Sequence, residues 1–265
     1  MACSLSDAGY RISEIVFSRG SRSARQARRL ARTLGAAAVS SDQPALSGQI
    51  VWICVPDSQI RNVAVLLGRT GHWKNRIVFH SSGALTSDEL RPLEQRGAAT
   101  ASVHPMMSFV PGVFPSLKDV PFAIEGNRAA VRAAQRVAGD LGGHPFPLAK
   151  RDKAAYHAWG AFVSPLLVSA LATAEQVAHA AGIKARDSRS RIAPIVRQTI
   201  ENYIQRGGSA AFSGPIIRGD AATVRKHLKV LAGIPEAREV YVALARSALR
   251  YLPSRDRKLL ALVLK

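Results

Sequence analysis

The stretch Ile50-Val51-Trp52-Ile53-Cys54-Val55 is an uninterrupted apolar run, as expected for a strand that is covered on both faces. Pro56-Asp57 follows it directly, and the Asp57 carboxylate can cap a helix that extends through Gly68. A buried strand that passes at once into a helix is the repeating unit of α/β sheets. The stretch therefore places this part of the chain in an α/β sheet.

Strand and helix patterns alternate on both sides of this run, up to about residue 148. The expected strands cover residues 13–17, 36–39, 50–55, 76–80, 100–103, 121–125 and 143–147. The expected helices between them cover residues 21–34, 57–68, 87–95 and 128–141. This alternation predicts a largely parallel, doubly wound sheet.

From about Lys150 onward the apolar period is 3.6 residues, and no strand pattern remains. Helices are expected at residues 151–181, 187–206, 221–232, 235–252 and 254–264, with Pro235 in a first turn and Ser254 as an N-cap. The predicted fold class is therefore α/β followed by all-α. We expect one domain over residues 1–149 and an all-helical domain over residues 150–265.

The net charge of +19, mostly from arginine, attracts anions such as nucleotides, phosphate-bearing cofactors, nucleic acid or acidic lipid. Arg22, Arg25, Arg29 and Arg32 share one face of an amphipathic helix whose other face is alanine and leucine. No aromatic interleaving and no known nucleic-acid motif accompany this face, so nucleic acid is not an expected partner.

The cysteines and histidines argue against a disulfide or metal framework. Cys3 and Cys54 are too few and too isolated for either, which fits a reducing cytoplasm. The histidines show no metal-ligand spacing with carboxylates or cysteines, so no metal is expected. The N-terminus lacks the charged-then-apolar layout of a signal peptide. Cytoplasmic localisation is therefore expected.

The segment from Ala154 to Ala174 has no charged residue and is long enough to span a bilayer. It also contains His157, Ser164 and Pro165, and many of its apolar residues are alanine, which inserts weakly. A helix buried within a helical domain or a dimer core is the favoured interpretation, and no membrane partner is expected.

Compact polar turns follow four of the predicted strands, at Ser18-Arg19, Pro56-Asp57, His80 to Gly83 and His104-Pro105. Ligands of open α/β sheets bind beyond the carboxyl ends of the strands, so these turns predict a ligand site. Loops of this kind are also polar without any function, and that alternative stays open.

Ser18-Arg19 follows the first recognisable strand, where a NAD-binding domain carries an acidic residue for the adenosine ribose. The Ser18 hydroxyl and the Arg19 guanidinium suit a ribose 2′-phosphate instead, because the guanidinium forks onto two phosphate oxygens. The pair therefore favours NADP over NAD as the cofactor.

The Gly-rich turn that such a domain places between its first strand and first helix is absent. Ser6-Asp7-Ala8-Gly9-Tyr10 reads like the end of that first helix. Either the sheet closes without its central first strand, or the protein begins upstream of Met1. We favour the second interpretation, a truncated N-terminus.

Lys153 and His157 stand at i and i+4, so they share a helix face at the start of the long apolar segment. Hydride transfer to a carbonyl or imine needs a proton donor near the accepting atom. Lys153, His157 and His104 are the candidate catalytic residues on this ground. The alternative for both histidines is a half-buried side chain with satisfied hydrogen bonds.

The segment from Phe212 to Asp220 lies between two helical stretches and combines a rigid turn with three chemically active side chains. Ser213, Arg218 and Asp220 are interpreted as substrate-binding residues, with the Arg218 fork suited to a carboxylate. The alternative is that Asp220 only caps the following helix and Arg218 is solvated.

These motifs resemble a poorly characterised family that joins an NADP-binding-type Rossmann domain to a C-terminal helical domain of unknown function. That family is distantly related to ketopantoate reductase, pyrroline carboxylate reductase and the phosphogluconate dehydrogenase group. The matching segments, in chain order, are Val55-Pro56-Asp57, His80 to Leu85, His104-Pro105 with Phe109, Tyr156-His157-Ala158, and Ser213 to Asp220.

The resemblance implies an oxidoreductase that uses NADP and forms a homodimer through its helical domain. The resemblance does not identify the substrate, which we expect to be small and polar, to carry a carboxylate and to bind in a cleft between the domains. The residues expected to line the dinucleotide, besides Ser18 and Arg19, are Val55, Pro56, Asp57, Ser81, Ser82 and Gly83. The alternatives are a non-enzymatic NADP sensor or inactive truncated protein and, less favoured, a binder of anionic surfaces or nucleic acid.

Overall fold

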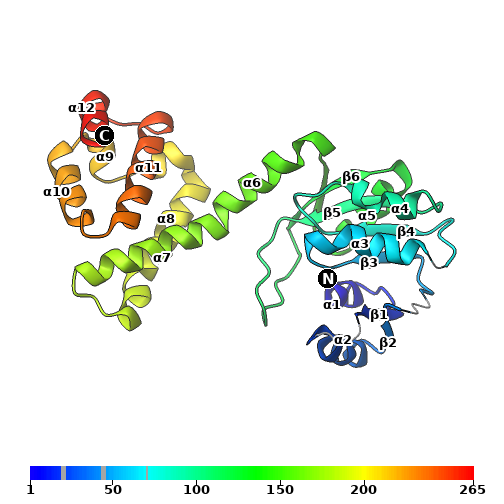
Figure 1. The fold of residues 1–265 in the computed structure, drawn as a ribbon. Helices are drawn as coiled ribbons and strands as arrows, with labels where there is room; N and C mark the ends of the chain where they lie inside the picture. Colours follow the sequence, from blue (N-terminus) through cyan, green and yellow to red (C-terminus); the bar gives the residue numbers. More distant parts are fainter. Residues whose placement is uncertain (19–21, 43–45, 70) are drawn as a thin grey trace. The chain divides into compact units, whose positions relative to one another are not determined.

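The structure is a computed structural model of the chain, and it describes residues 1–18, 22–42, 46–69 and 71–265. The chain forms two compact units, Met1–Ala161 and Phe162–Lys265, which are described in turn. Figure 1 labels their helices and strands.

The first unit is built around a five-stranded sheet in the order β3 (Ile50–Ile53), β4 (Ile77–His80), β5 (Ala99–Pro105), β6 (Pro121–Gly126) and β7 (His144–Pro147). All of its pairs are parallel except β5 with β6. The predicted mostly parallel, Rossmann-like sheet is therefore confirmed.

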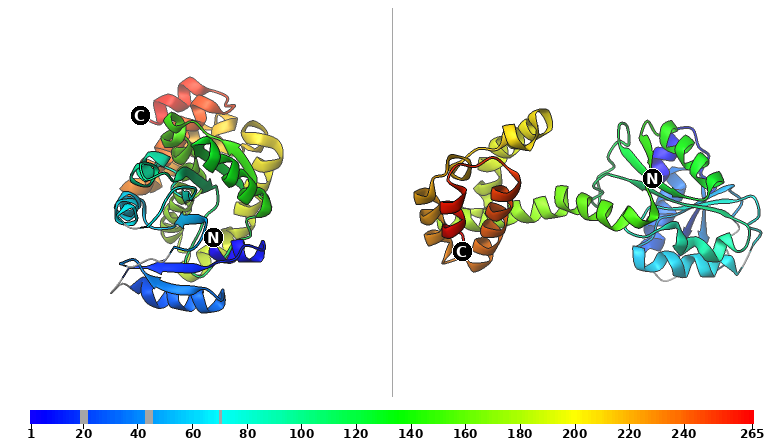
Figure 2. Two further views of the ribbon diagram at one scale, coloured as in Figure 1. Left: turned by 90° about the vertical axis from the view of Figure 1, so that its right-hand side faces the viewer. Right: turned by 90° about the horizontal axis from the view of Figure 1, so that it is seen from above.

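The apolar strands are explained by helices on both faces of the sheet, which Figure 2 shows with α5 (Arg128–Asp140) on one side and α3 (Asp57–Gly68) on the other. Neighbouring residues of a strand point to opposite faces. Val78 accordingly packs in the core under α3 with Ile60, whereas Phe79 packs under α5 with Val137. Both faces of β4 are thus covered by helices.

Strands β1 (Glu14–Phe17) and β2 (Ala37–Ser40) form a separate, two-stranded parallel sheet. Both views place this pair and α2 (Arg22–Thr33) beyond the β3 edge of the larger sheet (Figures 1 and 2). In the doubly wound order a central strand would separate β1 from β3. Among the described residues β1 and β3 are not paired, so the structure does not show the less favoured alternative, in which the sheet closes without that strand.

The remaining helices of the first unit are short. They are α1 (Ala2–Asp7), the 3₁₀ turns η1 (Ser87–Leu90) and η2 (Lys150–Asp152), α4 (Arg91–Glu94) and the start of α6 (Lys153–Val163). The expected helix end near Ser6 is confirmed by α1. The expected N-cap at Asp57 is wrong. Pro56 takes that position, and Asp57 begins the first turn of α3.

The second unit is wholly helical, as predicted. Its helices are α7 (Pro165–Ala180), α8 (Ala185–Ala211), α9 (Pro215–Arg218), α10 (Ala221–Leu231), α11 (Pro235–Tyr251) and α12 (Arg257–Val263). Val224, Val242, Leu260 and Leu264 are among the residues that form its core. The expected N-cap at Ser254 is wrong, since α12 is preceded by Asp256 and the Ser254 hydroxyl donates to the Ile216 carbonyl.

The expected single helix over residues 151–181 is broken between α6 and α7 at Ser164 and Pro165. Proline has no N–H to donate and its ring clashes with the carbonyl four residues earlier, which ends the first helix. The segment Lys150–Ala180 is long and apolar enough to cross a membrane by length and composition, and its most apolar stretch of 18 residues is 0% buried. It is therefore not a helix buried within its own domain, contrary to the first of the two expected settings.

Candidate functional site

Polar side chains meet in the first unit where β4 and β5 end and α6 begins. The register places His80 beside Ser102 on the neighbouring strand. Ser102 and His104 are two residues apart on β5 and so share one face of the sheet. The first turns of α6 bring Lys153, Tyr156 and His157 to this group.

The turn after β4 is held by two buried side chains. The His80 imidazole accepts from the Ser82 N–H through Nδ1 at 3.1 Å, and its Nε2 donates to the Thr86 carbonyl at 3.0 Å. The Ser82 hydroxyl donates to Asp57 at 2.7 Å and accepts from the Ala84 and Leu85 N–H groups. The turn is therefore fixed from within and tied to the start of α3.

Lys153 reaches this turn from α6 and is only 1% exposed. Its Nζ donates to the Ser82 carbonyl at 3.0 Å and to the Ser102 hydroxyl at 2.7 Å. Burial lowers the pKa of Lys153 to about 8, against the opposing pull of Glu125 and Asp57. A lysine with this pKa can hold or release a proton near neutral pH.

Two imidazoles cover Gly83. A Cβ added to this glycine would lie 2.8 Å from His104 Nε2 and 2.8 Å from His157 Cδ2. His104 Nδ1 is 2.8 Å from the hydroxyl of Tyr156, whose ring stands edge-on to the imidazole. Only glycine leaves room for both rings over the turn at this position.

Burial also keeps the neighbouring histidines neutral. It lowers the pKa of His104 to about 4, and the charges of Lys153 and His157 act in the same direction. Burial lowers the pKa of His80 to about 4 as well. The Tyr156 pKa is raised to about 12, so its hydroxyl keeps its proton. Of Lys153, His80, His104 and Tyr156, Lys153 has the pKa nearest to neutral pH.

Two family descriptions match the chain. Residues 1–105 match a Rossmann-like domain, and residues 120–248 match a domain of unknown function, DUF2520. The chain is a Rossmann-like domain followed by a DUF2520 domain. The resemblance drawn from the sequence motifs is thereby confirmed. No curated protein matches the chain.

Solved structures with the same fold are similar over nearly the whole chain at low identity. A Bacteroides fragilis protein, provisionally assigned as an NADP oxidoreductase, is 19% identical, with coverage of 93% of this chain and 91% of that one and a TM-score of 0.77. A Thermotoga maritima protein is 23% identical (92% and 92%, TM-score 0.72). An imine reductase from Myxococcus stipitatus, solved with NADP+, is 14% identical (94% and 89%, TM-score 0.63).

Most of the residues predicted for the cofactor lie in the Rossmann-like domain at the carboxyl ends of its strands. Val55, Pro56 and Asp57 follow β3, and the turn from Ser81 to Gly83 follows β4. Ser18 follows β1 and is exposed, whereas Arg19 lies outside the described residues. The three predicted catalytic side chains, His104, Lys153 and His157, are brought together around Gly83 and Ser82.

The predicted substrate residues lie in the second unit. Asp220 is the N-cap of α10, where its carboxylate accepts from the Thr223 N–H at 2.9 Å and from the Thr223 hydroxyl at 2.6 Å. The capping alternative is therefore what the structure shows for Asp220. Substrate binding by Ser213, Arg218 and Asp220 stays a prediction.

The sequence interpretation missed Ser102 and Glu125. Glu125, 6% exposed, accepts from the Ser87 N–H and hydroxyl, and it pairs in register with Ser102. Both residues stand next to buried apolar residues of their strands, at Ala101-Ser102-Val103 and Ala123-Ile124-Glu125. A polar residue inside a strand that is covered on both faces needs a partner, and that signal was available in the sequence.

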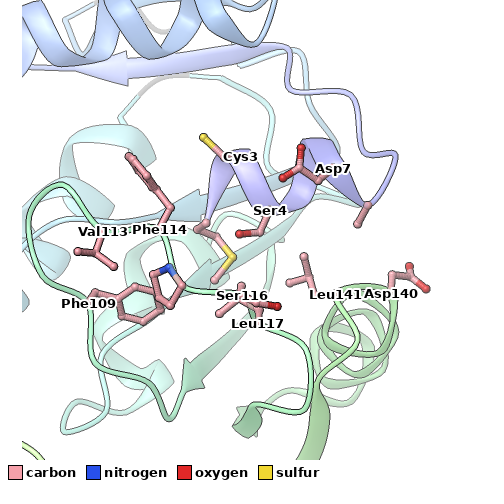
Figure 3. Close-up of a pocket in the computed structure, with 13 residues that line it drawn as sticks. Cys3, Ser4, Asp7, Phe109, Val113, Phe114, Ser116, Leu117, Asp140 and Leu141 are labelled. Carbon is pink, nitrogen blue, oxygen red and sulfur yellow. The ribbon is translucent and has the colours of Figure 1, made fainter.

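A separate pocket of about 470 Å³ lies between α1, the loop after β5 and the end of α5. Figure 3 shows Phe109, Val113 and Phe114 of the loop facing the helix that carries Cys3 and Ser4. None of the predicted site residues lines this pocket. This pocket and the group formed by His104, Lys153 and His157 are therefore different features of the domain.

Proposed function

We propose that this protein is an NADP-dependent oxidoreductase that transfers a hydride to or from a small polar substrate. The observation that carries the proposal is the grouping of Lys153, His104 and His157 around the Ser82–Gly83 turn. This grouping lies at the carboxyl ends of parallel strands, where doubly wound sheets bind their ligands. Titratable groups with shifted pKa values at such a place favour a catalytic centre.

The chemistry of the donor set fits a phosphate-bearing dinucleotide. Ser18 offers a hydroxyl after β1, and α2 has no acidic residue in its first turn and carries Arg25, Arg28 and Arg29. Arginine side chains suit the ribose 2′-phosphate that distinguishes NADP from NAD. Val55 to Asp57 and Ser81 to Gly83 would line the rest of the cofactor. Bound NADPH would supply the hydride.

Side chains of the protein would hold and deliver the proton that accompanies hydride transfer. His104 and His157 flank Gly83, and the Lys153 ammonium is fixed by two hydrogen bonds. The nearby charge of Lys153 opposes protonation of His104. A substrate that gains negative charge at this place would be stabilised by these donors.

The remaining parts of the proposal concern the substrate and the assembly. Ser213, Arg218 and Asp220 are proposed to face the substrate, and Arg218 is proposed to bind its carboxylate, because a guanidinium forks onto two carboxylate oxygens. A homodimer through the helical domain and a cytoplasmic location complete the proposal. Exposed apolar side chains on the helices of the second unit support the dimer.

The proposal is tested by titrating the protein with NADPH and with NADH and following nicotinamide fluorescence. We expect NADPH to bind at least about tenfold more tightly, because the 2′-phosphate adds charge-assisted hydrogen bonds. Ser18→Asp should remove that preference by repelling the phosphate, whereas Ser190→Asp on an exposed face of α8 should not.

NADPH binding that is weaker than millimolar would contradict the proposal. If NADPH binds but a panel of carbonyl and imine acids is not turned over, the protein is a sensor rather than an enzyme. Association with anionic vesicles or DNA that falls steeply with salt would favour the surface-binding alternative.

A further inference from the structure

The hydrogen bond between Tyr156 and His104 determines which nitrogen of the His104 ring carries the proton. The Tyr156 hydroxyl lies 2.8 Å from His104 Nδ1, and Tyr156 is 7% exposed. A phenol can donate or accept, whereas each nitrogen of a neutral imidazole does only one of the two. The direction of this bond therefore decides which tautomer His104 adopts.

The hydroxyl has one hydrogen-bond partner among the described residues, namely His104 Nδ1. If Nδ1 donated, the buried phenol proton would be left without an acceptor, which costs about 1–3 kcal/mol. If the phenol donates, the phenol hydroxyl and Nδ1 are both satisfied, and the ring proton on Nε2, which has no partner among the described residues, is left to bind a ligand. Nδ1 is then the acceptor, and Nε2 carries the imidazole proton.

The protonated nitrogen faces the turn after β4. His104 Nε2 is the atom nearest to a Cβ built on Gly83, at 2.8 Å, and the His157 ring lies equally close. The groups that act on the His104 charge come from two helices: Lys153 and His157 from α6, and Asp57 from α3. Lys153 and His157 lower the pKa of His104 and Asp57 raises it, but burial is the largest effect, so the ring stays neutral.

We infer that Tyr156 holds His104 as the neutral Nε2–H tautomer, and that Nε2–H donates a hydrogen bond to the substrate atom that gains negative charge on hydride transfer. His104 neither gains nor loses a proton in this role, so the proton that the reduced substrate takes up comes from Lys153 or His157, the other candidate donors. Tyr156 is a positioning residue. The inference rests on the proposed function for the substrate, but the tautomer is a property of the free protein.

The tautomer is measured by long-range ¹H–¹⁵N NMR correlations in full-length protein labelled with ¹⁵N-histidine, with His104→Gln to assign the signals. We expect one protonated nitrogen, Nε2, and one acceptor nitrogen, Nδ1, with no change between pH 7.5 and about 5.5. Tyr156→Phe should turn this pattern into a mixture of tautomers. An Nδ1–H tautomer in the natural protein, or an unchanged pattern in Tyr156→Phe, would overturn the inference.

The donor role of His104 is tested by measuring kcat with NADPH and a carbonyl or imine acid that the protein reduces. Tyr156→Phe should lower kcat by about tenfold to a hundredfold while the Kd for NADPH stays within about twofold, since the bond acts on the reacting atom and not on cofactor binding. Tyr203→Phe, at a 60% exposed position of α8, is the matched control and should change neither value.

The two failures are distinguishable. An unchanged kcat in Tyr156→Phe contradicts the donor role while the proposed function stands. Absence of NADPH binding contradicts the proposed function and the donor role together, whereas the spectra decide the tautomer in either case.

Discussion

His80 is a buried imidazole whose two nitrogens are both held by backbone groups of the same turn. Protonation of Nδ1 would break the bond from the Ser82 N–H and place a charge in a site that is 0% exposed. The side chain therefore fixes the turn only while it is neutral. Its role is to shape the loop that carries Ser82 and Gly83.

Acid should weaken the protein through this histidine before the carboxylates protonate. The pKa of His80 is about 4 in the folded protein and 6.5 in the unfolded chain, so the unfolded chain binds the proton first as pH falls. Stability is full above pH 6.5 and is lost between there and pH 4. We expect a loss of about 2 kcal/mol from His80 between pH 7 and pH 5.

The measurement is the free energy of unfolding in urea at several pH values. His80→Gln should lower stability at pH 7 and flatten its pH dependence by about one proton. His179→Gln, at an exposed position on α7, should leave the slope unchanged. An equal slope in His80→Gln and the natural protein would contradict the prediction.

Lys153 gives a pH dependence of the same sign, in a higher pH range. Its pKa is about 8 in the folded protein and 10.5 in the unfolded chain, so burial of the ammonium opposes folding below pH 8. The cost is relieved as pH rises from 8 toward 10.5. Relative to the natural protein, Lys153→Met should therefore be more stable at pH 7 than at pH 10, by about 2–3 kcal/mol.

The comparison of the two unfolding free energies at each pH cancels the other lysines and tyrosines. Lys226→Met, at an exposed position of α10, is the control and should show no such change with pH. If the difference between Lys153→Met and the natural protein were constant from pH 7 to pH 10, the ammonium would not be desolvated. The prediction concerns stability and holds whether or not the protein is an enzyme.

At the scale of elements, the strands were predictable because burial on both faces leaves an apolar run that few other structures produce. Four of the five residues of the expected strand 76–80 form β4, Ile77–His80. The break at Ser164 and Pro165 was missed because the apolar period continues through it. The expected helix at residues 87–95 is a 3₁₀ turn followed by one α-helical turn, with Pro92 at the junction.

Gly126 shows why β5 and β6 can approach closely where they pair. It has a φ of 148°, and a Cβ built on it would lie 2.3 Å from the Thr100 carbonyl oxygen and 2.6 Å from Ala101 Cα. Both obstacles are backbone atoms that cannot rotate away. Gly126→Ala should therefore destabilise the protein by on the order of 3 kcal/mol, from strain and overpacking together.

Gly139 is the matched control for that substitution. It lies near the end of α5 with nothing within 4 Å of an added Cβ, so Gly139→Ala should stabilise by about 0.5–1 kcal/mol. Thermal unfolding of the two variants beside the natural protein tests both signs. A Tm for Gly126→Ala equal to that of the natural protein would show that the strand pair can relax.

At the scale of the whole molecule, the sequence predicted the mostly parallel sheet and the helical second half, but not which side chains form the cluster at Gly83. His104, Lys153 and His157 were found because they are titratable and stand at element ends. The bond from Lys153 to Ser102 joins residues 51 positions apart in the chain, and no local pattern encodes such a pairing. The cap at Asp220 was predictable because it depends on Thr223 alone, three residues away.

The second unit exposes large apolar side chains on several of its helices. Val168 of α7 is 64% exposed, and Ile204 of α8 is 71% exposed. A pocket of about 430 Å³ between these two helices is lined by further apolar side chains, including Leu171 and Ile192. A second copy of the chain would cover this surface. Apolar helix faces of this kind pack against each other without charge pairs.

We therefore expect the protein to sediment as a dimer at micromolar concentration. Ile200→Glu with Ile204→Glu places two carboxylates one turn apart on the same face of α8 and should shift the protein to a monomer. Leu262→Glu, at a 61% exposed position of α12, adds a charge outside this surface and should leave the dimer intact. A monomeric natural protein would contradict the dimer, and its co-sedimentation with neutral lipid vesicles would identify a membrane as the partner of the apolar helices instead.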